Sequence, residues 1–515
     1  LSNADCDGAD NVLQLPLEDN WAHQLNGVIP QLEGTHWFYL LRAGDTLRES
    51  SLLVLAERIV GTPGMLCAYS DEGALVEGES AEPVFKPGFN LDLMRSYPYV
   101  GRTLAFERQR FLAVGGFDSA HGELAPHDLL WRLAEEAGLH TIEHIAEIQV
   151  ESTQTYADWL SLSEVIEGSE AVVSAHLDRI GLEHRIRNVD LPLLKRIDYL
   201  HAHRPVVSII IAAGTSLGAL QRCTESLIEQ TSYTEYEILI VDEGQGDSAM
   251  AEWLGAMSQL GAALLRVLRY DGRFGEAALV NFAASQARGE YLLTLNPRSV
   301  IYAGDWLAEL LNHAQRPEVG VVGARLLNSN GAIVSAGLIL GLAGPATSAF
   351  IGEHASARGY MQRLQVAQNW SAVSSDCLMV RKEVFDSLGQ LDEAEFNLGL
   401  SGVDLCLRAD KNGYLIVWTP FATVMMGEDT APALTQVDVQ AQVAEQESFY
   451  LKWLPKISRD PAYNPALTLG VASFSLEPSL RHNWNPFCHR DLPLILGLPV
   501  NESAIGHYRV TAPLA

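Results

Sequence analysis

The stretch that decides the fold runs from 207 to 247: VSIII (207–211), LGALQRCTESLIEQ (217–230) and YEILIVDEGQGD (236–247). The first and third segments begin with apolar, β-branched runs that are too short for helices, which is typical of strands buried on both faces of a sheet. The middle segment has apolar residues at helical spacing. Strand, helix and strand in this order predict a right-handed parallel crossover. Ligands bind at the carboxyl ends of such strands, where Asp242 lies.

Length and composition limit the class of protein. The chain has 515 residues, of which 48% are hydrophobic and 19% charged, so it can form two or three domains with sizeable cores and lacks the composition of a disordered chain. It has 35 Lys and Arg residues and 64 Asp and Glu residues, which gives a net charge of −29. Such a surface repels polyphosphates, so we expect no nucleic-acid partner.

The cysteines and the hydropathy pattern bear on the compartment. Six cysteines are scattered without the paired spacing of a metal site, which favours reduced, buried thiols. No apolar run reaches about 18 residues, so we predict no transmembrane segment. No secretory signal is recognised either. We therefore expect a cytoplasmic location, with peripheral attachment at the inner face of the membrane as the alternative.

Two longer motifs follow in the chain: YDGRFGEAALVNFAASQARGEYLL (270–293) and DWLAELLNHAQRPEVGVVGARLL (305–327). Together with the strands above, they resemble family 2 glycosyltransferases of the GT-A fold, from Val206 to about Glu428. In that family, the aspartate after the second strand holds the nucleobase, a carboxylate pair after a later strand binds the metal, and a downstream carboxylate activates the acceptor. The resemblance implies that Asp242 holds the base of a nucleotide sugar, and Asp242 with Asp247 could hold the base and ribose. Acids after a parallel strand can equally cap the next helix, so both interpretations stay open for these two residues.

The resemblance fails at the metal motif. The family's Asn-Asp-Asp-Thr turn reads Asn296-Pro297-Arg298-Ser299 here, so both carboxylates are replaced. We therefore predict no Mg²⁺ or Mn²⁺ at this turn and no cofactor. Two interpretations of Arg298 stay open: its guanidinium could bind the diphosphate directly, or it is an exposed turn arginine. We predict a pocket lined by Ala212, Asp242, Asn281 and Asn296 at the carboxyl ends of the strands.

The acceptor base of the family is also missing. Ser401-Gly402 stand where family members place Asp or Glu before the helix VDLCLR (403–408), and the family's histidine pair is Met426-Gly427. Asp404 is expected to be the structural acid that opens the helix, since an acid in the first turn is favoured by the helix dipole. His127, at the matching place in the first part of the chain, is either a base or, more commonly, a cap or surface residue.

An internal repeat predicts the domain organisation. GGFD (115–118) and HDLLWR (127–132) match GQLD (389–392) and VDLCLR (403–408) in order and nearly in spacing. Self-similarity at one long offset indicates duplicated domains. We predict two tandem α/β, GT-A-like domains with mostly parallel, Rossmann-like sheets. The first is a partial domain at 20–155 that lacks its nucleotide-binding half, and the second is a complete domain at 205–432. A helical connector at 156–204 joins them, and a helical, Pro/Trp-rich connector follows at 433–515.

These expectations define two functions. The first is a non-catalytic pseudo-transferase, a scaffold or binding portion of a larger enzyme for bacterial surface-glycan synthesis or protein glycosylation. Its partners would be a UDP- or dTDP-type sugar donor, a glycan or protein acceptor and a further transferase domain beyond residue 515. The alternative is an active, metal-independent glycosyltransferase, of the rhamnosyl-transferring type that YDGRFGEAALVN suggests.

Overall fold

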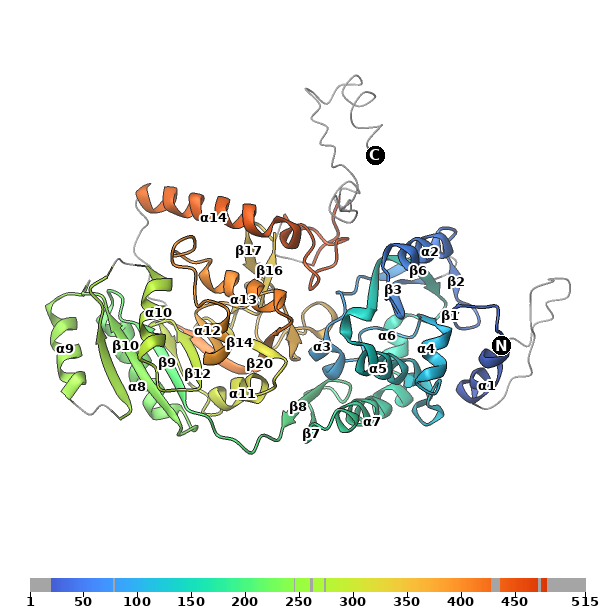
Figure 1. The fold of residues 1–515 in the computed structure, drawn as a ribbon, viewed down its shortest axis with the longest axis horizontal. Helices are drawn as coiled ribbons and strands as arrows, with labels where there is room; N and C mark the ends of the chain where they lie inside the picture. The colour runs from blue at the N-terminus through green and yellow to red at the C-terminus, as the bar shows by residue number, and fades with distance from the viewer. Residues whose placement is uncertain are drawn as a thin grey trace, which may run out of the picture.

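The computed structural model describes residues 20–76, 79–244, 246–259, 263–272, 275–427, 436–470 and 474–478. Two α/β domains lie side by side, the N-terminal one in blue to teal and the C-terminal one in green to orange (Figure 1). Each is built on its own sheet. The expected α/β class is therefore confirmed.

The second domain contains the stretch that decides the fold. Its main sheet runs in the order β11-β10-β9-β12-β19-β14-β20-β13. The elements are β9 (Val207–Ala212), α8 (Leu217–Gln230), β10 (Tyr236–Asp242), α9 (Ser248–Gln259), β11 (Leu265–Arg269), α10 (Glu276–Gln286), β12 (Tyr291–Leu295), β13 (Ser299–Val300), α11 (Trp306–Ala314), β14 (Val319–Leu327), β15 (Ile333–Ser335), β16 (Leu338–Leu340), β17 (Ala346–Ser348), β18 (Gln368–Asn369), β19 (Cys377–Arg381), α12 (Lys382–Ser387), α13 (Ser401–Lys411), β20 (Leu415–Met426) and α14 (Gln436–Ile457).

Alternating side chains of β9 explain the three layers of this domain. Ile209 and Ile211 pack with α8, α9 and α11 on one face of the sheet, whereas Ile210 packs with α10, α12 and α13 on the other. All three are at most 2% exposed, as expected for a strand buried on both faces. The crossover from β9 through α8 to β10 is parallel, as the sequence predicts.

The sheet is mixed, but four of the seven neighbouring pairs along this order run parallel, so the prediction of a mostly parallel sheet holds for this domain. β9, β10, β11 and β12 run parallel, but β19 pairs antiparallel with both β12 and β14. A short apolar run such as Cys377–Arg381 indicates a buried strand without indicating its direction. The long connection between β14 and β19 allows the chain to return in the opposite sense.

The first domain has the strand order β1-β5-β3-β6-β2. Its elements are α1 (Trp21–Val28), the 3₁₀ turn η1 (Ile29–Gln31), β1 (Trp37–Leu40), β2 (Thr46–Leu47), α2 (Ser51–Gly61), β3 (Cys67–Val76), β4 (Glu79–Val84), α3 (Leu91–Ser96), β5 (Leu104–Glu107), α4 (Arg108–Ala113), η2 (Ser119–Leu124), α5 (Ala125–Ala137), η3 (Leu139–Thr141) and β6 (Ile142–Ser152). Strand by strand, this order and its pattern of parallel and antiparallel pairs match β12-β19-β14-β20-β13 of the second domain.

The repeated motifs form the same hydrogen-bonded clamp in both domains. In α13, Arg408 donates to the Asp404 carboxylate at 2.7 Å and to the carbonyls of Leu388 and Gln390 at 2.5 and 2.7 Å. In α5, Arg132 donates to Asp128 at 2.8 Å and to the carbonyls of residues 114 and 116 at 2.5 and 2.6 Å. Each clamp ties the first turns of its helix to the glycine-containing turn before it.

The segment between the domains is only partly helical. It contains α6 (Tyr156–Leu160) and α7 (Ser163–Arg179), but then forms a hairpin of β7 (His184–Asn188) and β8 (Lys195–Tyr199). A wholly helical connector at 156–204 is therefore wrong. The reason is a change of period: buried and half-buried residues alternate along β8, which is the pattern of a strand. The predicted Pro/Trp-rich part of the C-terminal connector, around Trp484, lies outside the described residues.

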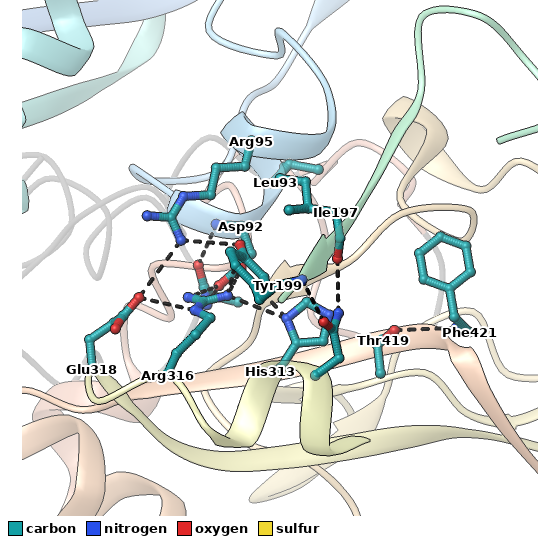
Figure 2. Close-up of polar contacts among 12 residues, drawn as sticks. Asp92, Leu93, Arg95, Ile197, Tyr199, His313, Arg316, Glu318, Thr419 and Phe421 are labelled. Carbon is teal, nitrogen blue, oxygen red and sulfur yellow. Dashed lines mark hydrogen bonds and ion pairs between the residues drawn. The ribbon is translucent and has the colours of Figure 1, made fainter. Parts of the chain in front are cut away.

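A buried ion pair joins the two domains (Figure 2). Asp92 of α3 accepts hydrogen bonds from both Nη atoms of Arg316, which follows α11. Tyr199 of β8 accepts from Arg316 at 3.2 Å, and Glu318 accepts from its Nε at 3.0 Å. Asn369 donates to Asp92 at 2.7 Å. Elements from both domains and the hairpin thus meet at one guanidinium.

The charges of this junction are stabilised by each other. Burial alone would raise the pKa of Asp92 and lower that of Arg316, but their mutual attraction and hydrogen bonds reverse both shifts. Burial lowers the pKa of the neighbouring His313 to about 3, so this imidazole is neutral near pH 7. The junction therefore stays charged and paired across the physiological pH range.

Four cysteines, Cys67, Cys223, Cys377 and Cys406, are buried free thiols, whereas Cys6 and Cys488 lie outside the described residues. Burial raises the pKa of each of these four thiols, which keeps them protonated. None of the helices in the described part of the chain combines the length and the hydropathy that crossing a bilayer requires.

Replacing Arg316 by Met should lower the free energy of unfolding by about 3–5 kcal/mol, because Asp92 would remain buried without its partner. Chemical denaturation at neutral pH measures this. The matched control is Arg110→Met, which removes the 3.1 Å ion pair with Glu136 on the surface and should cost less than about 1 kcal/mol. Equal effects of the two substitutions would contradict the role assigned to the junction.

Candidate functional site

The predicted site lies at the carboxyl edge of the parallel strands. β10 and β12 both pair in parallel with β9, one on each side. Asp242 ends β10 and Asn296 follows β12, so the two residues stand two strand spacings apart, roughly 10 Å. Ala212, at the end of β9, lies between them. The sheet therefore brings three of the four predicted lining residues to one edge.

Asp242 is engaged by a neighbouring cation. Its carboxylate accepts a hydrogen bond from the Gly244 N–H at 2.8 Å and an ion pair from Arg269 Nη1 at 2.6 Å. Arg269 is opposite Asp242 in the parallel register of β10 and β11, and it also reaches Asp271 at 3.3 Å. The hydrogen bonds to Asp242 and Asp271 raise the pKa of Arg269. The edge thus presents an acceptor and a donor side by side, of which sequence reasoning identified only the acceptor.

Asp247 caps a helix. Its carboxylate accepts a hydrogen bond from the Met250 N–H at 2.9 Å, three residues along the chain at the start of α9. This is the geometry of an N-cap residue, which satisfies a donor that the helix leaves unpaired. The capping interpretation therefore accounts for this carboxylate without a ligand.

Asn281 ties α10 to the loop after α12. Its side chain donates to the Leu391 carbonyl at 2.9 Å and accepts from the Leu391 N–H at 3.0 Å. It lies one and a half turns into α10 rather than at the end of a strand. This reciprocal pair of bonds gives Asn281 a structural role in the protein as it stands.

The turn that replaces the metal motif is closed on itself. Asn296 donates from its side chain to the Asp376 carboxylate at 2.7 Å, and its own side-chain oxygen accepts from the Arg298 N–H at 3.0 Å and Nε at 3.4 Å. Asp376 also accepts from Ser374 at 3.0 Å. Arg298 is half-buried rather than fully exposed. Its guanidinium is thus held beside the turn at 296–299.

Glu276, the first residue of α10, is a titratable group that the sequence analysis missed. Burial, followed by the charges of Asp376 and Glu445, raises the pKa of its carboxyl to about 7. Glu276 lines one small cavity with Thr294, Ser375 and Gly402. An acid in the first turn of a helix is favoured by the dipole alone, so the sequence carried no sign of this environment.

At the position predicted for the acceptor base, Ser401 and Gly402 carry no carboxylate. A Cβ atom added to Gly402 would require the Ser375 hydroxyl to move. Asp404 accepts hydrogen bonds from Arg408 and from the Trp453 indole at 2.9 Å, which gives it the structural role expected. His127 is 2% exposed, bonded to the Gly101 carbonyl, and burial lowers its pKa to about 4. It is therefore neither a cap nor a surface residue.

Comparison with known proteins agrees with the motifs. Residues 208–389 match the model of the glycosyl transferase family 2. The chain is 32% identical over 448 residues to the uncharacterized protein y4gI of Sinorhizobium fredii (strain NBRC 101917 / NGR234), covering 85% of this chain and 49% of that protein. It is 33% identical over 451 residues to the O-antigen biosynthesis protein RfbC of Myxococcus xanthus, covering 85% of this chain and 34% of that protein. The chain thus spans about half the length of the first relative and about a third of the length of the second.

Two solved structures align with parts of the chain. One is the mannosyltransferase PcManGT from Pyrobaculum calidifontis in complex with GDP-Man and Mn²⁺, with a TM-score of 0.32 and 17% identity over 45% of this chain and 59% of that one. The other is GalNAc-T7 with UDP, GalNAc and Mn²⁺, with a TM-score of 0.39 and 16% identity over 54% of each chain.

The family match covers the part of the chain that contains β9, β10, β12 and the turn at 296–299. It also includes the motifs at 270–293 and 305–327 on which the resemblance rests. The second domain therefore belongs to glycosyltransferase family 2.

Proposed function

We propose that the second domain binds a nucleotide-sugar donor at the edge formed by Asp242, Arg269 and Asn296 but does not transfer the sugar. The chain would then be a non-catalytic portion of a larger glycosyltransferase for bacterial surface-glycan synthesis or protein glycosylation. The two relatives, of which it spans only a part, support a larger whole. One of them is an O-antigen biosynthesis protein, which supports the surface-glycan class.

The observation that carries this proposal is the conversion of both catalytic positions into closed structural contacts. At the first position, Asn296 and Asp376 bond to each other and Arg298 stands in place of an acid. At the second, Gly402 has no side chain and lies against the Ser375 hydroxyl. Transfer needs stabilisation of the departing diphosphate and removal of the acceptor proton, and the latter is typically worth about 10² to 10⁴ in rate.

The donor edge suits a particular kind of nucleobase. Asp242 accepts hydrogen bonds, and the exposed Arg269 beside it donates them. Uracil and thymine present an N–H donor flanked by carbonyl acceptors, which complements such a pair. This favours a UDP- or dTDP-type donor. The acceptor, a glycan or a protein, and the further transferase domain beyond residue 515 would complete the assembly, in the cytoplasm or at the inner face of the membrane.

The proposed tandem architecture is consistent with a nucleotide site in the second domain alone. The first domain repeats the strand order of β12 to β20, but the described residues of its sheet have no counterparts of β9, β10 and β11. Two of these strands, β10 and β11, carry Asp242 and Arg269 of the donor edge in the second domain. We therefore propose that only the second domain retains a nucleotide site.

One observation favours an active enzyme as the alternative. Glu276 has a carboxyl with a pKa of about 7 and lines the same cavity as Gly402, so it is placed to replace the absent base. A base is most effective when its pKa lies near the working pH. Arg298 would then supply the charge that a metal provides elsewhere, as in a metal-independent, rhamnosyl-type transferase.

Asp242→Ala should weaken UDP binding about tenfold, because a charge-assisted hydrogen bond to the base is lost. Calorimetry with the full chain measures this, beside an assay for donor hydrolysis and sugar transfer, in which we expect no turnover. The matched control is Asp247→Ala, which removes the α9 cap and should cost about 1 kcal/mol of stability without changing UDP affinity. Robust turnover that Arg298→Ala abolishes would instead establish the alternative.

Mn²⁺ should not change the affinity of the chain for UDP, because the turn at 296–299 has no carboxylate and its nearest acid, Asp376, is already bonded to Asn296 and Ser374. Titrations with Mn²⁺ and with EDTA are compared. A tenfold or greater gain in UDP affinity with Mn²⁺, lost in Asp376→Asn, would show that a metal site is present after all.

The protonation of Glu276 predicts a pH-dependent stability. Its folded-state pKa of about 7 exceeds the ordinary value of 4.5, so the wild type loses stability relative to Glu276→Gln as pH rises through this window. Between pH 5 and 8 the difference should grow by about 2 kcal/mol. Denaturation at both pH values measures it, with the exposed Glu252→Gln as control. A constant difference would remove Glu276 as a candidate base.

A further inference from the structure

The first domain contains a cavity of about 480 Å³ between α1, η1 and β1. Its walls are mainly apolar and include Leu25, Val28 and Ile29 on one side and Phe38, Leu40 and Phe106 on the other. Most of these side chains are only half-buried among the described residues. Small-molecule sites have this size and this predominantly apolar lining.

Charged groups gather at one end of the cavity. Arg42 and Arg102 both line it, and both donate to the Gln154 side-chain oxygen, at 2.7 and 2.9 Å. Two guanidinium groups thus converge on one neutral acceptor. Glu123, the one carboxylate among the lining residues, is paired with Arg42.

The positive charge of Arg102 is only weakly compensated by nearby carboxylates. It is 5% exposed, and its Nε is buried without a hydrogen-bond partner. The carboxylate nearest to it, Glu72, is 4.0 Å away and lies closer to Lys86, at 2.7 Å. Burial, and after it the charge of Arg102, lowers the pKa of Arg42. An anion between the two guanidinium groups would relieve this repulsion.

The cavity occupies a position where α/β folds bind ligands. Arg42 follows β1 and precedes β2, just as Asn296 follows β12 and precedes β13 in the second domain. The turn thus stands at the carboxyl end of a strand. In the second domain, β9 pairs with the edge of β12 that faces away from β19. In the described part of the first domain, no strand pairs with the corresponding edge of β1, and side chains of β1 line the cavity. Among the described residues, the space beside β1 is therefore open to a ligand.

We propose that this cavity binds an anionic amphiphile, with a phosphate or carboxylate head at Arg42 and Arg102 and a hydrocarbon chain between α1 and β1. Apolar walls with few polar groups match a hydrocarbon chain better than a sugar, which needs many hydrogen bonds. The site is separate from the donor edge of the second domain and does not depend on sugar transfer.

The test uses the full chain and four twelve-carbon probes below their micelle concentrations: dodecyl phosphate, dodecanoate, dodecanol and dodecyltrimethylammonium. Calorimetry should show saturable 1:1 binding of an anionic probe, with dodecanol at least tenfold weaker and the cation not binding. The stronger of the two anions identifies the head group. Equal binding of dodecanol, or no saturable binding of either anion, would overturn the proposal.

Two variants locate the site. Arg42→Gln should weaken binding of the preferred anion about tenfold, and Val28→Trp should block it by filling the cavity. Thermal unfolding checks that both variants remain folded, and unchanged UDP binding shows that the second domain is unaffected. Arg110→Gln, on the surface of α4, is the control for a general loss of positive charge. Unaltered anion binding in both Arg42→Gln and Val28→Trp would place the amphiphile elsewhere and refute the assignment.

Discussion

The arrangement of the chain depends on the ion pair between Asp92 and Arg316. A buried charge is tolerated only when its partners are fixed, so this pair holds α3, α11 and the β7–β8 hairpin in one geometry. Asn90 and Asn369 reinforce it, because each side-chain amide bonds to the backbone or side chain across the same boundary. Polar groups with specific directions thus fix this part of the boundary between the two domains.

Much of this architecture could be predicted from the sequence, because apolar period and repeated motifs are local signals. The runs at 207–211 and 236–241 became β9 and β10, and the repeat became the two clamps of Arg132 and Arg408. Strand direction was not predictable, since an apolar run such as 377–381 reads the same in either sense. The β7–β8 hairpin was missed because its alternation is short and polar.

The candidate site was predictable only where the strands alone position it. Asp242 and Asn296 reach one edge because β10 and β12 flank β9. Arg269 and Asp376 escaped notice because they meet Asp242 and Asn296 only through the pairing of β10 with β11 and of β12 with β19. The raised pKa of Glu276 depends on burial and on two carboxylates from other elements, and no local pattern encodes such an environment.

The two domains share one sheet pattern and differ in what stands beside its first strand. Where β9 pairs with β12, the edge carries an acceptor and a donor, Asp242 and Arg269, at which we propose that a nucleobase binds. Where β1 has no such neighbour in the described chain, α1 leaves an apolar space with two guanidinium groups at its end. Because side chains at strand ends are free of packing constraints within the sheet, one framework can present different chemistry in each copy. Turns without acids at 296–299 and 401–402 are thus compatible with an intact sheet.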